Sequence, residues 1–508
     1  MIGDRFAERL GSAPDRRATA RWQAALIAAS AGAALLAGWE VAIGNEALVV
    51  AALAAGAFLV WTLARPQHAA LAVLAVLPFL IYPASAGGLS LFAGVPLVAL
   101  VSVALLLAQR GSWRRLRRRL SVPAFGVLLT FAVAAAAHST SLSTAGSRLL
   151  YLSLFAVFAW ALASSITGGT ISSRAVATAV VISACVAAVA LIVQVVAQFG
   201  AGQHAIISWL TGEFRLFAGQ RAATVAQENR NWVVGSLNVV RGIFPFMAAP
   251  SAGQYEMLGL VAAVWLWRTR PPAISPAARS ALALAIVLTA AGLLMTLSRQ
   301  SWVGALAGIV ALGLRRDPLR PVAIVALLFL VLAVMPVPGG HSTFGDYLLT
   351  ASDTTSVSSG TRLGLLTQAI HLIPAHAVIG VGPGLYGTLN PDPANPVYYA
   401  HNVWLDETVE LGVGGGLALI AVFLLAMRSA LQRRAMLGFS LLAAYVVANL
   451  FDDVLYFPRN GILLAAAFAL AAAGDGERAS RPARPAADPL PDRPLAIGWA
   501  PAQSGRPA

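Results

Sequence analysis

Charged side chains are scarce in this sequence of 508 residues: only 11% of the residues are charged, whereas 58% are hydrophobic. A typical soluble domain carries about 25% charged residues. The shortage argues against a soluble globular enzyme, a disordered protein and a nucleic-acid-binding protein. Helices satisfy the backbone polar groups of long apolar runs inside a lipid bilayer. The sequence therefore predicts an all-α, polytopic membrane protein.

Cysteine is nearly absent, because Cys185 is the only one in the chain. A single cysteine excludes an intramolecular disulfide and a cluster of cysteine ligands for zinc or iron–sulfur. Cys185 lies in an apolar stretch, which is typical of a small packing residue. No metal-binding spacing of histidines or carboxylates appears, so the sequence predicts no metal and no cofactor.

Lysine is absent altogether, so all 35 basic residues are arginines. The codon usage of a GC-rich genome is one explanation. Phosphate binding by planar guanidinium groups is the other. The position of each arginine has to decide between them.

The apolar runs predict about fourteen helices, several of them shorter than the ~20 residues that a membrane span needs. Two of the short ones, 68–83 and 301–314, are candidates for re-entrant or tilted helices, so we expect about 12–14 transmembrane helices. The expected limits are 22–43, 46–64, 68–83, 89–109, 122–138, 147–166, 175–199, 251–267, 281–297, 301–314, 321–336, 403–427, 435–451 and 461–473.

Arginines are concentrated in four of the intervening loops, at 110–119, 268–279, 315–320 and 428–434. Cytoplasmic loops of membrane proteins carry an excess of basic residues. With fourteen helices, all four loops and both termini fall on one side, which we expect to be cytoplasmic. The net charge of +14 is then mostly a topology signal and does not indicate nucleic acid as a partner.

This orientation divides the chain into three parts. The segment after the last apolar run is rich in Pro, Ala and charge, which is typical of disorder. We expect a cytoplasmic segment 1–21, a membrane domain 22–473 with periplasmic segments 200–250 and 337–402, and a disordered cytoplasmic tail 474–508.

Eight arginines remain on the predicted outward side, where arginine is unusual. Three of them, Arg241, Arg299 and Arg362, lie at membrane edges between apolar flanks. Such an arginine is costly and is a candidate for function, although it can also snorkel to lipid headgroups. Arg362 lies where a helix is expected to begin, which suits an anion. The other five are Arg148, Arg215, Arg221, Arg230 and Arg459.

His401 and Asn402 immediately precede an apolar helix, at the expected boundary between water and membrane. A neutral imidazole there can accept a proton, whereas a helix-capping or interfacial histidine is the alternative. Glu410 lies two and a half turns further on, so we expect it to make hydrogen bonds elsewhere. Asp406 and Glu407 are nearer to His401, and spacing does not rank them as its partner.

Two adjacent carboxylates, Asp452 and Asp453, end the penultimate apolar run. Adjacent side chains diverge on a helix, so we do not expect them to hold a metal ion together. We interpret them as an outward pair at the membrane edge, with Arg459 as a candidate partner.

Three segments, in this order, resemble the bacterial O-antigen ligase family. RGIFPFMAAPSAGQY (241–255) is similar to the family's Arg-x-x-Gly-x-Phe-x-x-Pro-Asn-x-x-Gly region, with Ser251 in place of Asn. TLSRQSWVG (296–304) is similar to its Thr-x-Ser-Arg stretch. The segments SGTRLGLLTQAIHLI, GVGPGLY and HNVWLDETVELGVGG are similar to its long external loop and the helix after it.

The resemblance implies a glycosyltransferase at the outer face of the bacterial inner membrane. It would move a glycan from undecaprenyl diphosphate to a hydroxyl of lipid A core, as a ligase, or to another lipid-linked repeat, as a polymerase. His401 would act as the catalytic base, with Asn402 and Glu410 in support. The donor diphosphate would be held by Arg241, Arg299 and Arg362, with Arg215 and Arg221 as further candidates.

Ligation is favoured within the family because the external loop is long enough to cover a second, bulky lipid. Polymerisation stays open. A lipid-linked substrate transporter is the alternative from another class, since outward arginines could bind an anionic substrate. Transporters usually place charges near the membrane midplane and often contain internal repeats, and this sequence shows no repeat.

Overall fold

A computed structural model of the chain describes most of the predicted membrane domain. The predicted segment 1–21, the spans 22–43 and 321–336, and the tail beyond residue 474 lie outside it. The described residues are 56–80, 83–86, 89–92, 94–108, 122–199, 231–234, 237–243, 245–246, 248–313, 357–389, 399–452, 455 and 457–474.

The described residues form mostly helices, in agreement with the prediction. Four of these helices, α8, α9, α14 and α19, are long and apolar enough to cross a membrane, and six shorter apolar helices accompany them. The protein is therefore a helical, polytopic membrane protein. The helices are α4 (Pro66–Val76), α5 (Gly94–Ala108), α7 (Val122–Ala137), α8 (Leu142–Thr167), α9 (Ser173–Phe199), α13 (Ala249–Arg268), α14 (Pro276–Met295), α15 (Arg299–Gly313), α18 (Val357–Leu372), α19 (Val403–Arg433), α20 (Met436–Ala448) and α21 (Pro458–Ala473), with short 3₁₀ turns η1 (Leu77–Phe79), η2 (Pro374–His376) and η3 (Tyr386–Leu389).

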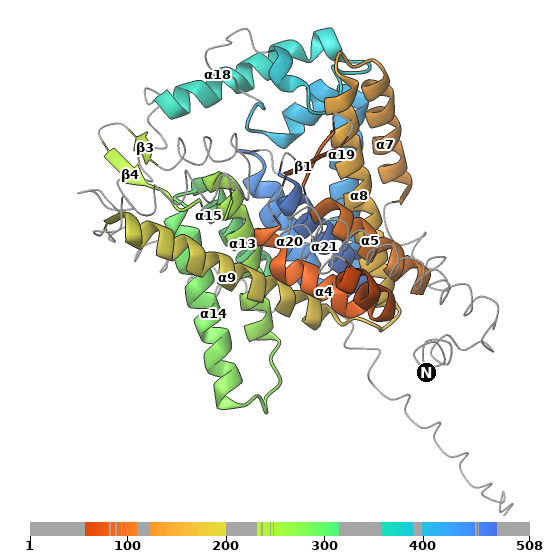
Figure 1. The fold of residues 1–508 in the computed structure, drawn as a ribbon. Helices are drawn as coiled ribbons and strands as arrows, with labels where there is room; N and C mark the ends of the chain where they lie inside the picture. The colour runs from red at the N-terminus through yellow and green to blue at the C-terminus, as the bar shows by residue number, and fades with distance from the viewer. Residues whose placement is uncertain are drawn as a thin grey trace, which may run out of the picture.

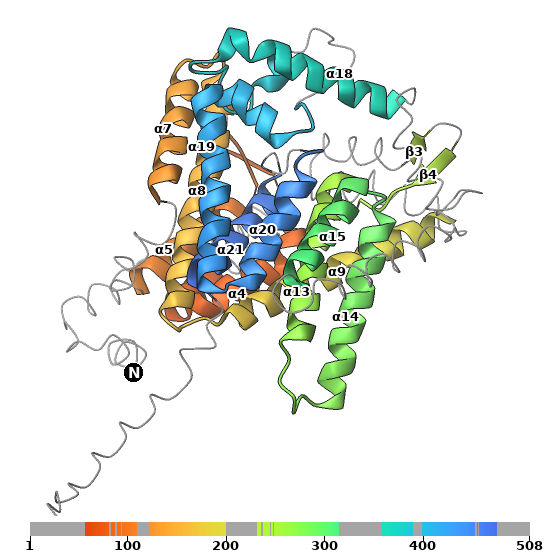
Figure 2. The ribbon, with the colours of Figure 1, turned by 180° about the vertical axis from the view of Figure 1, so that it is seen from behind.

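The helices pack as a bundle with one helix lying across its end (Figures 1 and 2). Helix α8 packs against α21 and α5, and α19 packs against α7, α20 and α21. Helix α13 packs against α9, α14, α15 and α20, and so connects α9 and α14 to α20. Helix α18 crosses one end of the bundle and contacts α19 (Figure 1). We call this end the α18 end.

Two short antiparallel hairpins interrupt the helical order, and neither was expected. Strands β1 (Pro83–Ala86) and β2 (Leu89–Phe92) lie between α4 and α5, where the sequence suggested the ends of two spans. The two residues between them in the sequence are glycines, which favour a two-residue hairpin. Strands β3 (Asn231–Val234) and β4 (Leu237–Val240) form the second hairpin, within the predicted external segment.

Helix α19 is broken at Gly412, where φ is 78° and ψ is 170°. A Cβ atom at this position would lie 2.7 Å from the carbonyl oxygen of Val378, so the close approach requires glycine. At the break, backbone N–H groups of the turn after α18 donate to two carbonyl groups of α19. Val381 donates to Val409 O at 3.1 Å and Gly382 donates to Glu410 O at 3.0 Å. The continuous helix predicted over 403–427 is therefore two helices joined by a turn that another segment completes.

Candidate active site

A histidine–aspartate pair lies at the α18 end of the bundle, between the start of α19 and the loop after α20. The Nδ1 atom of His401 lies 3.4 Å from Oδ1 of Asp452. The side chain of Asp452 is 1% exposed and that of His401 is 23% exposed, so the imidazole is the part that a substrate can reach. Gln300, in the first turn of α15, donates from Nε2 to Oδ2 of Asp452. Both carboxylate oxygens therefore have contacts, which orient the carboxylate toward the ring.

Sequence reasoning missed Asp452 as the partner of His401 and considered Asp406 and Glu407. Oδ1 of Asp406 accepts the backbone N–H of the residue before His401 at 2.6 Å. Oε1 of Glu407 lies 3.4 Å from a guanidinium nitrogen of Arg148. Both carboxylates thus bind other groups near the start of α19. The available signal was weak: Asp452 ends an apolar run at the same predicted membrane edge as His401.

The position of the imidazole is fixed by the main chain around it. His401 has a left-handed backbone conformation, with φ of 56°, which is uncommon outside glycine and is often found at functional sites. Asn402 caps α19, because its Oδ1 accepts two first-turn N–H groups at 3.1 Å. Its Nδ2 donates to Leu450 O at 3.0 Å and joins α19 to the end of α20. The ring of Tyr399 packs edge-on against the imidazole, with 4.5 Å between the ring centroids.

Glu410 holds the glycine-rich turn that follows α18, in agreement with the hydrogen-bonding role expected for it. Its carboxylate is buried and accepts the backbone N–H of Gly384 at 2.6 Å and that of Tyr386 at 3.2 Å. Gly384 has φ of 75°, a conformation that favours glycine. Burial and the nearby Asp406 carboxylate raise the pKa of Tyr386, whose hydroxyl donates to Leu365 O at 3.3 Å. The carboxylate of Glu410 therefore fixes a turn against α19.

Arg241 is buried and is connected to the segment that precedes Arg299. Its Nε donates to Thr296 O at 3.2 Å. The backbone around Arg241 is held by Gln194 of α9, whose Nε2 donates to Arg241 O at 3.2 Å and whose Oε1 accepts the N–H of Ile243 at 2.9 Å. Gln194 was not singled out in the sequence, because a lone glutamine in an apolar run does not reveal its partner.

Arg299 begins α15 and is partly exposed. Its neighbour Gln300 binds Asp452, so the structure connects the segments of Arg241 and Arg299 to the histidine–aspartate pair. The sequence predicted that a helix begins near Arg362, but α18 begins five residues earlier, at Val357, so Arg362 lies in its second turn and not at its N-terminus. The side chain of Arg362, and both Arg215 and Arg221, lie outside the described parts of the chain.

Arg459 does not meet Asp452 as we had suggested. Its guanidinium instead donates to Pro78 O at 2.9 Å and to Pro245 O at 2.8 Å, and lies 4.9 Å from the ring centroid of Phe246. These partners come from two separate segments, and Arg459 joins both to the start of α21. Pro78 and Pro245 have no backbone N–H group, but their carbonyl oxygens can accept hydrogen bonds from the buried guanidinium.

The described residues contain no group of three or more His, Cys, Asp and Glu side chains that could hold a metal ion. The arrangement thus combines a partly exposed imidazole with a buried carboxylate, and Gln300 connects that carboxylate to the helix that begins with Arg299.

Residues 284–420 match a family model described as O-antigen ligase. This part of the chain, about a quarter of its length, is similar to the O-antigen ligase family. The match confirms the resemblance seen in the sequence, and it includes Arg299, Arg362 and His401, whereas Arg241 and Asp452 lie outside it. The similarity implies a glycosyltransferase-like membrane ligase or polymerase that acts on lipid-linked glycans. A comparison with curated proteins finds no match.

Proposed function

We propose that this protein is an O-antigen ligase family member that transfers a glycan from undecaprenyl diphosphate to a hydroxyl acceptor at the periplasmic face of the inner membrane. Lipid A core is the favoured acceptor. The observation that carries the proposal is the pairing of His401 with a buried carboxylate, next to arginine-bearing segments. That combination suits removal of a proton from a hydroxyl and departure of a diphosphate in one site.

His401 acts as the general base in this reaction. With Nδ1 directed at Asp452, Nε2 is the ring nitrogen that accepts the proton of the acceptor hydroxyl. The hydroxyl oxygen attacks the anomeric carbon, the bond between that carbon and the diphosphate oxygen breaks, and the electron pair leaves with undecaprenyl diphosphate. The Asp452 carboxylate orients the imidazole and stabilises the imidazolium that forms.

The arginines stabilise the negative charge of the leaving diphosphate. Guanidinium groups bind phosphate through two parallel hydrogen bonds, and fixed cations in a site shielded from water lower the barrier to charge development. Arg299 is partly exposed next to Gln300, which makes it the best-placed of the described arginines. We assign Arg241 and Arg362 to the same role, with Arg215 and Arg221 as further candidates.

A reconstituted transfer assay tests the proposal. The purified protein in nanodiscs is incubated with an undecaprenyl diphosphate-linked glycan, with or without lipid A core. Glycan on lipid A core establishes a ligase, and longer lipid-linked glycans formed without that acceptor establish a polymerase. Movement of the donor lipid across the bilayer with no new glycosidic bond would favour a transporter and would refute the proposal.

A further inference from the structure

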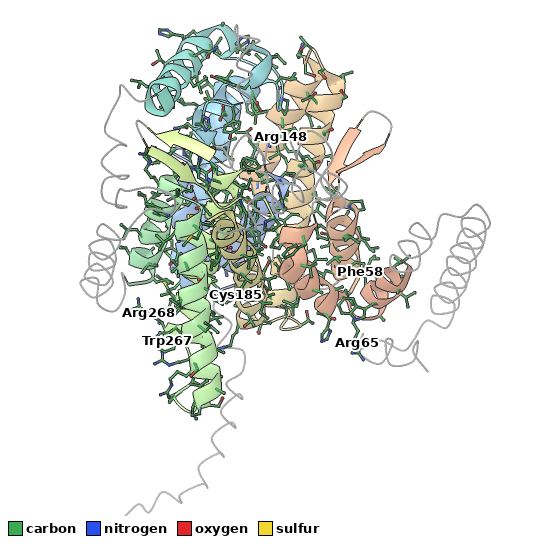
Figure 3. All side chains as sticks on the ribbon, turned by 60° about the vertical axis from the view of Figure 1, so that its left-hand side comes forward. Phe58, Arg65, Arg148, Cys185, Trp267 and Arg268 are labelled. Carbon is green, nitrogen blue, oxygen red and sulfur yellow. The ribbon has the colours of Figure 1, made fainter. Side chains whose placement is uncertain are left out.

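Arg148 of α8 is buried near the α18 end of the bundle (Figure 3). Its guanidinium contacts two other segments. One guanidinium nitrogen lies 3.4 Å from Oε1 of Glu407, and the other terminal nitrogen donates to Leu455 O. Glu407 lies on α19, in the second turn after His401. Leu455 lies in the loop that carries Asp452. A single side chain therefore connects the segment of the base to the segment of its carboxylate.

The stem of Arg148 also packs against the glycine-rich turn after α18. A Cβ atom added at Gly384 would lie 3.6 Å from Cβ of Arg148. Gly384 donates to Glu410, which lies on the same helix as Glu407. The start of α19, the loop that carries Asp452 and the glycine-rich turn therefore all meet at Arg148.

A contribution to stability alone does not explain this ion pair well. The side chains of Arg148 and Glu407 are only 8% and 2% exposed, so both charges lose most of their hydration. The desolvation cost of a buried ion pair often exceeds its Coulombic gain, and apolar replacements can be neutral or stabilising. What a buried pair can supply is a defined relative position of the segments that it joins.

We propose that Arg148 is a positioning residue that sets the geometry of the His401–Asp452 pair. This inference rests on the proposed function, because it assigns to Arg148 a role in the same reaction. It also separates Arg148 from the arginines assigned to the donor diphosphate, since its guanidinium is directed at Glu407 and Leu455. The unusual location of this arginine on the predicted outward side thus has a local reason.

Two substitutions weaken the connection in different ways. Arg148→Gln removes the charge and one of the two contacts, and Glu407→Gln keeps the shape of the partner but removes its charge. We expect each to lower kcat by about 10- to 100-fold, the range typical of residues that orient a catalytic group, with little change in the KM for the donor. Arg148→Lys retains one contact and should recover part of the activity.

A double-mutant cycle with Asp452→Asn distinguishes positioning from general structural support. If Arg148 acts through the pair, Arg148→Gln should cause no further loss of kcat once Asp452 is already neutral. If the two losses multiply, Arg148 acts independently of the pair and the proposal is wrong. Arg174→Gln is the matched control, because Arg174 also donates to a carbonyl, Thr269 O at 3.2 Å, at the start of α9 and the opposite end of the bundle.

Rates are measured per monodisperse folded protein, so that poor folding is not mistaken for slow chemistry. If the folded fractions of Arg148→Gln, Arg148→Lys and Glu407→Gln all keep wild-type kcat, Arg148 is purely structural and the inference fails. If the wild-type protein forms no glycosidic bond, the proposed function itself fails, which is a different outcome.

Discussion

Asp452→Asn is the substitution that most sharply tests the chemistry of the site. Asparagine keeps the size of the side chain and can still accept the hydrogen bond from Gln300 through its oxygen. The amide nitrogen would then face Nδ1 of His401 and donate to it. Nδ1 would become the acceptor and Nε2 would carry the proton, so the imidazole would be in the wrong tautomer to act as a base.

The magnitude follows from the 3.4 Å separation of His401 Nδ1 and Asp452 Oδ1. Unit charges at this distance interact by about 5 kcal/mol at an effective dielectric constant of about 20. The imidazole is 23% exposed, which weakens the interaction by solvent screening. We therefore expect kcat to fall by about 10²- to 10³-fold, since each ~1.4 kcal/mol corresponds to a factor of ten.

The assay is the initial rate of glycan transfer at saturating donor, together with the KM for the donor, in nanodiscs. KM should stay within about twofold, because Asp452 is buried behind His401 and acts on the transition state. Asp453→Asn removes the same charge one residue further along and is the control. A rate for Asp452→Asn within twofold of wild type would refute the proposed role of the pair.

Three further predictions concern the residues around the pair. Glu410→Gln removes one of the acceptors for two backbone N–H groups, and should lower the free energy of unfolding by about 1–3 kcal/mol, measured by thermal unfolding in detergent. Gly412→Ala introduces a Cβ 2.7 Å from Val378 O at a left-handed position, and should cost about 1–3 kcal/mol in the same measurement; an unchanged melting temperature would contradict the described break. Arg362→Lys keeps the charge but loses the planar fork, and should reduce transfer by about 10-fold or more; unchanged transfer would indicate an arginine with no role in donor binding.

The helical architecture was predictable because apolar runs of this length have few other solutions in a bilayer. The prediction of 147–166 corresponds to α8 (Leu142–Thr167), and that of 175–199 to α9 (Ser173–Phe199). The hairpin of β1 and β2 was missed because four-residue strands with apolar flanks look like the ends of spans. The break at Gly412 was missed because its cause is a segment that approaches from elsewhere in the sequence.

The candidate site was predictable only in part. His401 and Arg299 stood out because polar residues at the edge of apolar runs are costly. The carboxylate of the pair did not, because 51 positions separate His401 from Asp452 and only the packing of α19 against α20 brings them together. The burial of Arg148 between two segments of the site likewise depends on tertiary packing.

The most direct test of the central claim is the transfer rate of His401→Ala, measured alongside binding of the undecaprenyl diphosphate-linked donor to the same protein. We predict that transfer falls by about 10²- to 10⁴-fold, the usual contribution of a general base, whereas donor binding is retained because the arginines are intact. Transfer by His401→Ala at a near wild-type rate would contradict the assignment of His401 as the base.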